Sequence, residues 1–281
     1  MDKQQKKDLE IFATNIRIET IKALGYLGFG HVGGAFSVAD LIAVLYGGVM
    51  KIDPKNPKWE DRDYLVCSKG HAGPVIYTTL AMKGFFPMEE LLTINKPKTH
   101  LPSHCDRNLT TGIDMTTGSL GQGSSLAVGI ACGNKLDKKD NYTYLIMGDG
   151  EIQEGQVWEA ASFAAHRKLD NLITFVDWNK KQLDGYITEI NDFTNIAERF
   201  EAFGWNAVTV NGHDVEAIWN AIDECKKVKG KPSCIVLDTV KAHGCSFAEN
   251  ATSNHHITIS EQQLTEALAA LEEHMAKVVA E

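Results

Sequence analysis

The sequence has no run of apolar residues long enough to cross a lipid bilayer, which takes about 18 consecutive positions. Its N-terminus also lacks the apolar segment of a signal peptide. An excess of positive charge is missing too, because 28 lysines and arginines face 37 acidic residues and leave a net charge of -9. We therefore expect a cytoplasmic protein that binds neither a membrane nor nucleic acid.

Paired cysteines and two common nucleotide-binding signatures are also absent. The six cysteines include no Cys-x-x-Cys pair, so we expect reduced thiols and neither a zinc site nor a disulfide framework. The glycine-rich stretch 118–123 is not followed by Gly-Lys-Ser/Thr, which excludes a P-loop. Residues 28–33 spell the dinucleotide fingerprint Gly-x-Gly-x-x-Gly, but they follow a helical pattern, whereas that fingerprint follows a strand. We expect these glycines to end a helix and to leave His31 exposed on a tight turn.

What the sequence does contain is an alternation of helices and buried strands, which predicts an α/β fold with a mostly parallel sheet flanked by helices. Ser37 and Ser260 each stand where a capping box would begin a helix. No linker or repeat divides the chain, so we expect one domain, residues 1–281, that ends in a C-terminal helix. The expected helices are 9–24, 37–46, 124–133, 158–167, 215–228 and 261–280, and the expected strands are 64–67, 144–147, 172–176, 205–210 and 234–240.

An oxygen-bearing side chain follows each of two neighbouring predicted strands. Asp149 comes after strand 144–147, and Asn179 comes after strand 172–176. Both side chains are therefore expected at the carboxyl edge of the sheet, where α/β proteins bind ligands. Carboxylate and amide oxygens suit a hard divalent cation, and the glycines on either side of Asp149 let backbone N–H groups approach phosphate oxygens. The pair predicts a magnesium–diphosphate site.

Four of the ten histidines lie in loops marked by glycine, serine or proline: His31, His71, His104 and His255. A single loop histidine is by default a surface residue, whereas several imidazoles near a diphosphate could orient hydroxyl groups and move protons. Spacing along the chain leaves both interpretations open. Two of these histidines lie in polar stretches, 93–120 and 241–259, whose length and weak periodicity are typical of functional loops. His256 is adjacent to His255, which is poor geometry for joint metal chelation.

In this order, the motifs resemble those of thiamine diphosphate (ThDP) enzymes, and of transketolase in particular. Asp149, with its flanking glycines, and Asn179 are similar to the ThDP–magnesium signature, which other ThDP enzymes share. The resemblance to transketolase is carried by several motifs and covers nearly the whole chain: residues 30–33, 68–72, 116–123, 148–155 and 239–255. It implies the ThDP-binding fold of this family, in its diphosphate-binding form.

The resemblance also implies a role for individual residues. Mg²⁺, or Ca²⁺ or Mn²⁺ in its place, would be bound by Asp149, Asn179 and the main-chain oxygen of Lys181. Contacts to ThDP fall on His71, Gly118, Ser119, Leu120, Gly150 and Asn179. The substrate-facing catalytic imidazoles fall on His31, His104 and His255. In the implied reaction a ketose carbonyl is attacked by the ThDP ylide, a histidine takes a hydroxyl proton as a carbon–carbon bond breaks, and the two-carbon unit passes to an aldose. His255 is the candidate for that proton.

A complete transketolase is much longer and has a second, pyrimidine-binding domain that supplies the glutamate activating the cofactor. The chain instead resembles the separately encoded N-terminal, diphosphate-binding subunit of a split transketolase. The resemblance implies that activity needs a C-terminal partner subunit, in a heterotetramer with two copies of each chain. Glu154 is expected at the interface that couples paired sites.

Four departures from the family pattern fall where the donor sugar would lie. Val32 stands where proline is usual, and the others are at 102–105, 241–244 and 254–256. The diphosphate signature is intact, so the donor is left open between an ordinary pentose phosphate and a modified ketose, such as a sulfonated or branched sugar. Two alternatives share that signature: the α subunit of a 2-oxo-acid dehydrogenase, and a ThDP-binding protein without catalytic activity.

Overall fold

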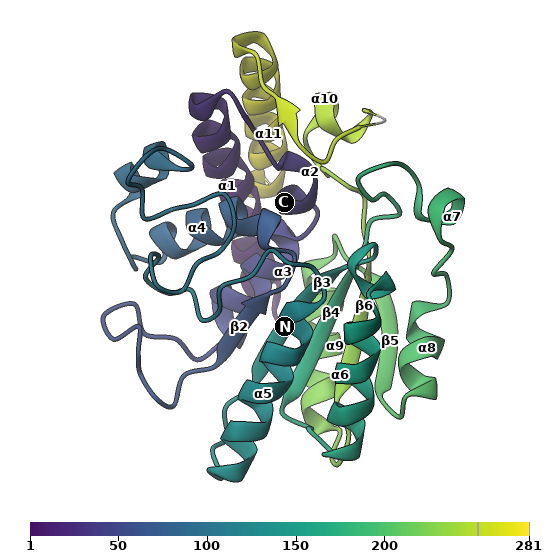
Figure 1. Cartoon of the computed structure of the whole chain (residues 1–281). Helices are drawn as coiled ribbons and strands as arrows, with labels where there is room; N and C mark the ends of the chain where they lie inside the picture. The colour runs from purple at the N-terminus through teal and green to yellow at the C-terminus, as the bar shows by residue number, and fades with distance from the viewer. Residues whose placement is uncertain (252, 281) are drawn as a thin grey trace.

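The computed structural model describes residues 1–251 and 253–280, so Glu281 and Thr252, within the predicted loop 241–259, lie outside the described part of the chain. A five-stranded parallel sheet lies at the centre, in the order β2-β3-β4-β6-β5 (Figure 1). Its strands are β2 (Tyr64–Cys67), β3 (Thr143–Gly148), β4 (Leu172–Trp178), β5 (Asn206–Asn211) and β6 (Ser233–Asp238). The predicted α/β fold is confirmed, and all five predicted strands are present.

Helices cover both faces of the sheet, and each face has its own apolar core (Figure 1). Strand residues alternate between the cores, so Ile146 and Phe175 pack on one face and Leu145 and Val176 on the other. A strand buried on both faces needs an almost continuous apolar run, which is why β3 and β4 are recognisable in the sequence. One face is covered by α1 (Lys3–Leu27), α3 (Ala39–Val44), α4 (Gly73–Met82) and α9 (Val215–Lys227), and the other by α5 (Gln122–Leu136), α6 (Gly155–His166) and α8 (Ile196–Ala202).

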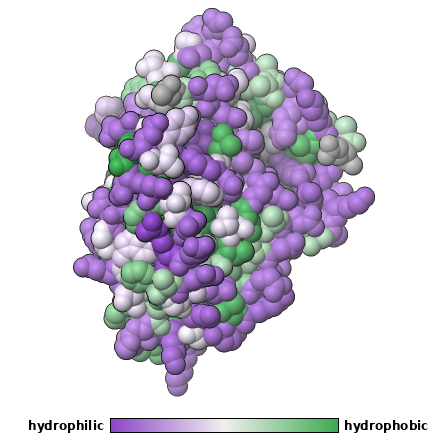
Figure 2. All heavy atoms as spheres, turned by 90° about the vertical axis from the view of Figure 1, so that its right-hand side faces the viewer, coloured by the Kyte–Doolittle hydropathy of each residue, from purple (hydrophilic) through white to green (hydrophobic). Residues whose placement is uncertain are grey.

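The C-terminal helix α11 (Glu261–Ala280) packs against α1, and Leu271 shares a third apolar cluster with Ile21. Its start is a reciprocal capping box, as predicted. The Gln263 N–H donates to the Ser260 hydroxyl at 3.2 Å, and the Ser260 N–H donates to the Gln263 side chain at 3.0 Å. Within residues 1–251 and 253–280, no helix is long and apolar enough to span a membrane. The face in Figure 2 is mostly hydrophilic, with apolar side chains in scattered groups.

The segment predicted as one capped helix at 37–46 differs in the structure. The chain forms α2 (Val32–Phe36), then α3, then a π-helical turn η1 (Leu45–Val49). The predicted cap at Ser37 is wrong, because its hydroxyl donates to the buried carboxylate of Asp177 at 2.7 Å. Helix α4 was not predicted, because it is buried on all sides and has no polar face that would give a helical periodicity. The remaining short helices are η2 (Gly70–Ala72), η3 (Met88–Thr93), η4 (Glu151–Gln153), α7 (Ile187–Ile190) and α10 (Ser246–Glu249).

A two-stranded antiparallel ribbon joins distant parts of the chain. Strand β1 (Phe29–Gly30) pairs with β7 (Ile257–Thr258) directly after α1 has ended. Gly28 ends that helix with a φ of 89°, a left-handed conformation that favours glycine, as the glycine pattern predicted. The next histidine, His31, is half-buried, so its predicted exposure is wrong. The rings of His255 and His256, in the loop that precedes β7, contact the His31 ring.

Candidate functional site

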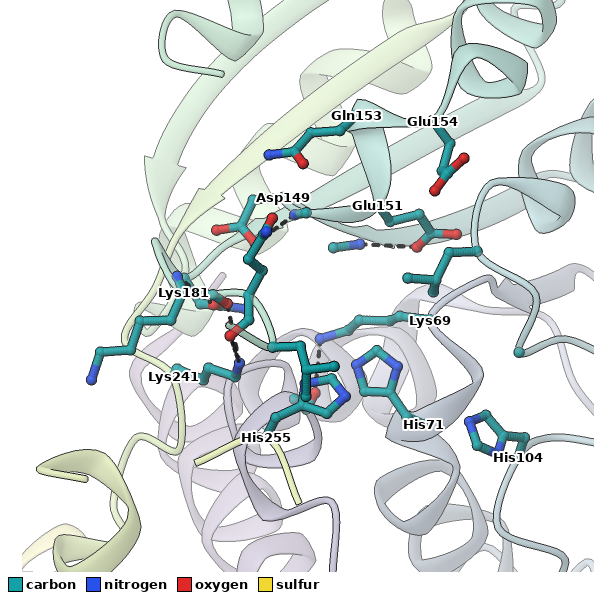
Figure 3. Close-up of a pocket in the computed structure, with 18 residues that line it drawn as sticks. Lys69, His71, His104, Asp149, Glu151, Gln153, Glu154, Lys181, Lys241 and His255 are labelled. Atoms are coloured by element: carbon teal, nitrogen blue, oxygen red, sulfur yellow. Dashed lines mark hydrogen bonds between the residues drawn. The ribbon is translucent and has the colours of Figure 1, made fainter. Parts of the chain in front are cut away.

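A cavity of about 370 Å³ opens at the carboxyl edge of the sheet, where β2, β3 and β4 end (Figure 3). Loops that are distant in the sequence complete its walls. Most of the residues predicted to contact cofactor, metal or substrate line it: His71, His104, Gly118, Leu120, Asp149, Gly150, Asn179, Lys181 and His255. Ser119 is exposed next to the lining residues Gly118 and Leu120, and His31 contacts the rings of the lining histidines.

Asp149 is the first residue after β3, and its side chain is almost fully buried. One carboxylate oxygen accepts the Gly150 N–H at 2.8 Å, and the other accepts the Lys180 N–H at 2.6 Å. Burial, followed by the nearby charge of Asp177, raises the pKa of Asp149 to about 7. A cation at these oxygens would oppose both effects and favour the ionised carboxylate.

Asn179 and Lys181 provide the other predicted metal ligands, just beyond β4. The Asn179 side chain donates to Asp177 at 2.8 Å, and its oxygen accepts the Lys181 N–H at 3.1 Å. The main-chain oxygen of Lys181 accepts the ammonium of Lys241 at 3.1 Å. Burial lowers the pKa of Lys241 to about 8, although Asp149 and Asp177 favour its charged form. The structure therefore places a cationic group against one of the three oxygens predicted to hold the metal, the main-chain oxygen of Lys181.

The donor set fits a hard divalent cation that is bound together with a diphosphate. It offers one carboxylate, one amide oxygen and one main-chain oxygen, so phosphate oxygens could fill the remaining positions. Over residues 1–251 and 253–280, no group of three or more His, Cys, Asp or Glu side chains is arranged to hold a metal. Two glycines also let a ligand approach the backbone closely. A Cβ at Gly150 would lie 3.0 Å from Gln182, and one at Gly118, where φ is 137°, would lie 3.0 Å from the His104 ring.

A fully buried ion pair supports the floor of the cavity. The Lys69 ammonium donates to Asp177 at 2.6 Å and to the main-chain oxygen of Gly34 at 2.7 Å. Burial alone would raise the pKa of Asp177, but Lys69 and hydrogen bonds from Ser37 and Thr239 hold it below its usual range. Asn179 donates to the same carboxylate. Sequence reasoning missed Asp177, for which the available signal was a carboxylate within the apolar run of β4.

The buried carboxylate of Glu151 holds three of the recognised motifs together. It accepts the Gly121 N–H at 2.8 Å, the Gly148 N–H at 3.1 Å and the hydroxyl of Ser68. Burial raises the pKa of Glu151, and these donors oppose that effect. The Glu151 side chain therefore joins motifs 68–72, 116–123 and 148–155 in space.

Imidazole rings gather at the wall of the cavity opposite Asp149 (Figure 3). The ring centroid of His31 lies 5.6 Å from that of His71, 5.7 Å from His104, 5.3 Å from His255 and 4.7 Å from His256. His71 and His255 are 4.6 Å apart. All four loop histidines singled out in the sequence are thus brought together. His256 is a fifth member that sequence reasoning missed, although it falls in one of the four departures from the family pattern.

Burial is the main cause that lowers the pKa values of these imidazoles. The pKa is lowered to about 3 for His31 and to about 4 for His255, and it is lowered for His71 and His104 as well. Repulsion from the other imidazoles, where they are protonated, and from the Lys241 ammonium adds to the effect at His31. At pH 7 these rings are neutral, and each has one N–H donor and one acceptor. Each ring can therefore donate a hydrogen bond to one sugar hydroxyl and accept a hydrogen bond from another.

Comparison with known proteins assigns the chain to a family. The profile of the family described as "Transketolase, thiamine diphosphate binding domain" matches residues 9–277. The chain belongs to the transketolase family. It is 50% identical to the 6-deoxy-6-sulfo-D-fructose transketolase subunit SqwG of Clostridium sp. (strain MSTE9), over 97% of this chain and 99% of that protein. It is 34% identical to a subunit of the apulose-4-phosphate transketolase of Phocaeicola vulgatus, over 98% of this chain and 97% of that protein.

Solved transketolases share the fold. The transketolase from Leishmania mexicana matches with a TM-score of 0.86 and 30% identity, over 97% of this chain and 45% of that chain. The transketolase from Campylobacter jejuni matches with a TM-score of 0.83 and 30% identity, over 100% of this chain and 48% of that chain. The chain thus spans about half the length of these enzymes, and its relatives favour a transketolase subunit over the α subunit of a 2-oxo-acid dehydrogenase.

Proposed function

We propose that this transketolase subunit, as one ThDP-binding domain over residues 1–281, transfers a two-carbon ketol unit from a ketose to an aldose when a C-terminal subunit completes its site. One observation carries the proposal. A single cavity has the oxygens of Asp149, Asn179 and Lys181 on one wall and neutral imidazoles on the other. The oxygens suit a metal–diphosphate, and the imidazoles suit a polyhydroxylated substrate.

The cofactor would be held by residues of the strand ends. Mg²⁺, or Ca²⁺ or Mn²⁺ in its place, would be bound by Asp149, Asn179 and the main-chain oxygen of Lys181. The contacts to ThDP would come from His71, Gly118, Ser119, Leu120, Gly150 and Asn179. The Lys241 ammonium lines the same cavity and favours an anionic diphosphate there. When bound, ThDP supplies the carbanion that adds to the ketose carbonyl.

The imidazoles would position the donor and move its proton. His31 and His104 would bind donor hydroxyls, and their ring centroids lie 5.7 Å apart in an edge-to-face arrangement. His255 would take the proton from the hydroxyl on the carbon that leaves, so that this carbon becomes the aldehyde of the first product. His255 is neutral at pH 7 and therefore has a lone pair for that proton.

We propose a modified ketose, first of all a sulfonated one, as the donor. Three of the four departures from the family pattern, at Val32, 102–105 and 254–256, include or adjoin a histidine of the imidazole cluster. The fourth, 241–244, begins at Lys241, which contacts the main-chain oxygen of Lys181. Two relatives that match over nearly their whole length are named for 6-deoxy-6-sulfo-D-fructose and for apulose 4-phosphate. An ordinary pentose phosphate is the competing donor.

The proposed partner is the C-terminal, pyrimidine-binding subunit of a transketolase, in a heterotetramer with two copies of each chain in the cytoplasm. Two observations support a partner. Both of these relatives are named as subunits, and the solved transketolases extend well beyond the matched half. Glu154 is exposed at the cavity, which suits its proposed place in the interface that couples paired sites. The six thiols are free, which fits a reducing compartment.

The test is a ketol-transfer assay of this chain by itself, of the isolated C-terminal subunit and of the assembled pair. We expect transfer only from the pair, and calorimetry should show Mg²⁺-dependent binding of ThDP to this chain. Full activity of this chain by itself would contradict the split site. Binding of ThDP without transfer by the pair would favour a non-catalytic role, and transfer to a lipoyl acceptor would favour a 2-oxo-acid dehydrogenase subunit.

A further inference from the structure

His256 occupies a defined place beside the imidazole cluster. The ribbon of β1 and β7 sets Gly30 opposite Ile257, so the residues just outside this pair, His31 and His256, face each other. Their ring centroids are 4.7 Å apart in an edge-to-face arrangement. The Phe29 ring contacts the same imidazole at 5.5 Å. Two ring contacts thus orient a histidine that is otherwise exposed to solvent.

His256 is not one of the residues that line the cavity. His71, His104 and His255 line the cavity, and His31 contacts all three of these rings. His256 contacts the His31 ring and is exposed to solvent. A substrate that reaches out of the cavity past His31 would therefore meet the exposed ring of His256.

The charges around this wall favour an anion. The ammonium group of Lys241 lines the cavity, and its charge acts on both His31 and His255. The charge of Lys69 is compensated by its ion pair with Asp177, and the chain as a whole carries a net charge of -9. An anionic group would therefore be attracted to the imidazole wall against the overall charge of the protein.

We propose that His256 is a specificity-determining residue that binds an anionic group on the terminal carbon of the donor ketose, a phosphate or a sulfonate. The proposal rests on the proposed function and deepens it. An imidazole N–H of His256 would donate to an oxygen of the anion, and the charge of this acceptor makes the hydrogen bond charge-assisted. The contact with His31 holds the ring of His256 in place. Among the described residues, neither ring nitrogen of His256 takes part in a side-chain hydrogen bond.

The test compares three donors in the assembled pair: 6-deoxy-6-sulfofructose, fructose 6-phosphate and fructose. We expect His256→Gly to lower the preference for the anionic donors over fructose, as a ratio of kcat/KM, by about 10-fold, the loss of one charge-assisted hydrogen bond. Most of the change should be in KM rather than in kcat. His256→Gln keeps an N–H donor and should recover part of the preference. The matched control is His274→Gln, an exposed histidine on α11.

Two results would overturn the proposal: an equal loss for all three donors, which indicates a structural role only, or an unchanged preference. The donor with the larger loss identifies phosphate or sulfonate as the group bound. A chain-only measurement separates this idea from the proposed function. The imidazole signal of His256 in a ¹³C-labelled sample should shift with fructose 6-phosphate and not with fructose, even if the pair transfers no ketol unit. An equal response to both sugars, or none, would also contradict it.

Discussion

Asp149 combines burial, two backbone hydrogen bonds and a neighbouring carboxylate, so its ionised form gains strongly from a bound cation. We expect Asp149→Asn to weaken Mg²⁺-dependent ThDP binding by at least about 10-fold, because the only carboxylate of the proposed donor set is lost. Isothermal titration with ThDP and Mg²⁺ measures this. Asp184→Asn, an exposed carboxylate in the loop after β4, is the matched control and should bind normally. Equal affinities for both variants would remove Asp149 from the metal site.

We expect substitutions of Lys69 and Asp177 to change the free energy of unfolding non-additively. Lys69→Met leaves Asp177 buried without its counter-charge, and we expect a loss of about 3–5 kcal/mol in the free energy of unfolding. Addition of Asp177→Asn to that variant should recover part of the loss, because the buried charge is then removed. Urea unfolding of the wild type, both single variants and the double variant completes the cycle. Additive losses would show that the two side chains do not depend on each other.

At the scale of elements, α2 lies so close to the loop before β7 that only glycine fits at position 33. A Cβ there would overlap the main-chain oxygen of Asn254, next to His255. We expect Gly33→Ala to displace residues 254–256 from His31 and to raise the donor KM of the assembled pair several-fold, while ThDP affinity changes little. Steady-state kinetics and calorimetry measure the two effects.

The control for Gly33→Ala is a glycine with free space around it. A Cβ at Gly129 on α5 meets no atom within 4 Å, so Gly129→Ala should keep or raise the stability of the chain, by up to about 1 kcal/mol. If Gly33→Ala left the donor KM unchanged, the close approach of α2 would have no part in positioning His255.

The elements differ in how well the sequence predicts them, and the reason is physical. The strands that are buried on both faces, such as β3, have apolar runs that local reasoning recognises, and these runs place Asp149 and Asn179 at one edge. The contacts of Asp177 and His256 depend on residues far away in the chain, which no local pattern contains. Helix α4 is missed because a helix that is buried on all sides has no polar face to set a period.

At the scale of the whole molecule, histidines buried in their neutral form couple stability to pH. The pKa is lowered to about 3 for His31 and to about 4 for His255 and His243, in each case mainly by burial. An unfolded histidine titrates near about 6.5, so below that pH the unfolded chain binds more protons than the folded one. Their contribution to stability is therefore complete above about pH 6.5 and is lost as the pH falls towards 4. The slope per group is at most about 1.4 kcal/mol per pH unit.

Asp149 has the opposite effect on the pH dependence of stability. Its raised pKa makes the folded chain bind more protons than the unfolded chain between about pH 4 and pH 7. We expect the free energy of unfolding of His255→Gln to fall less steeply than that of the wild type between pH 7 and pH 5, measured by urea unfolding at several pH values. His274→Gln removes an exposed histidine and should keep the wild-type slope. Parallel curves for wild type and His255→Gln would mean that the imidazole wall already titrates as in the unfolded chain, and that it is open to water rather than closed around a substrate site.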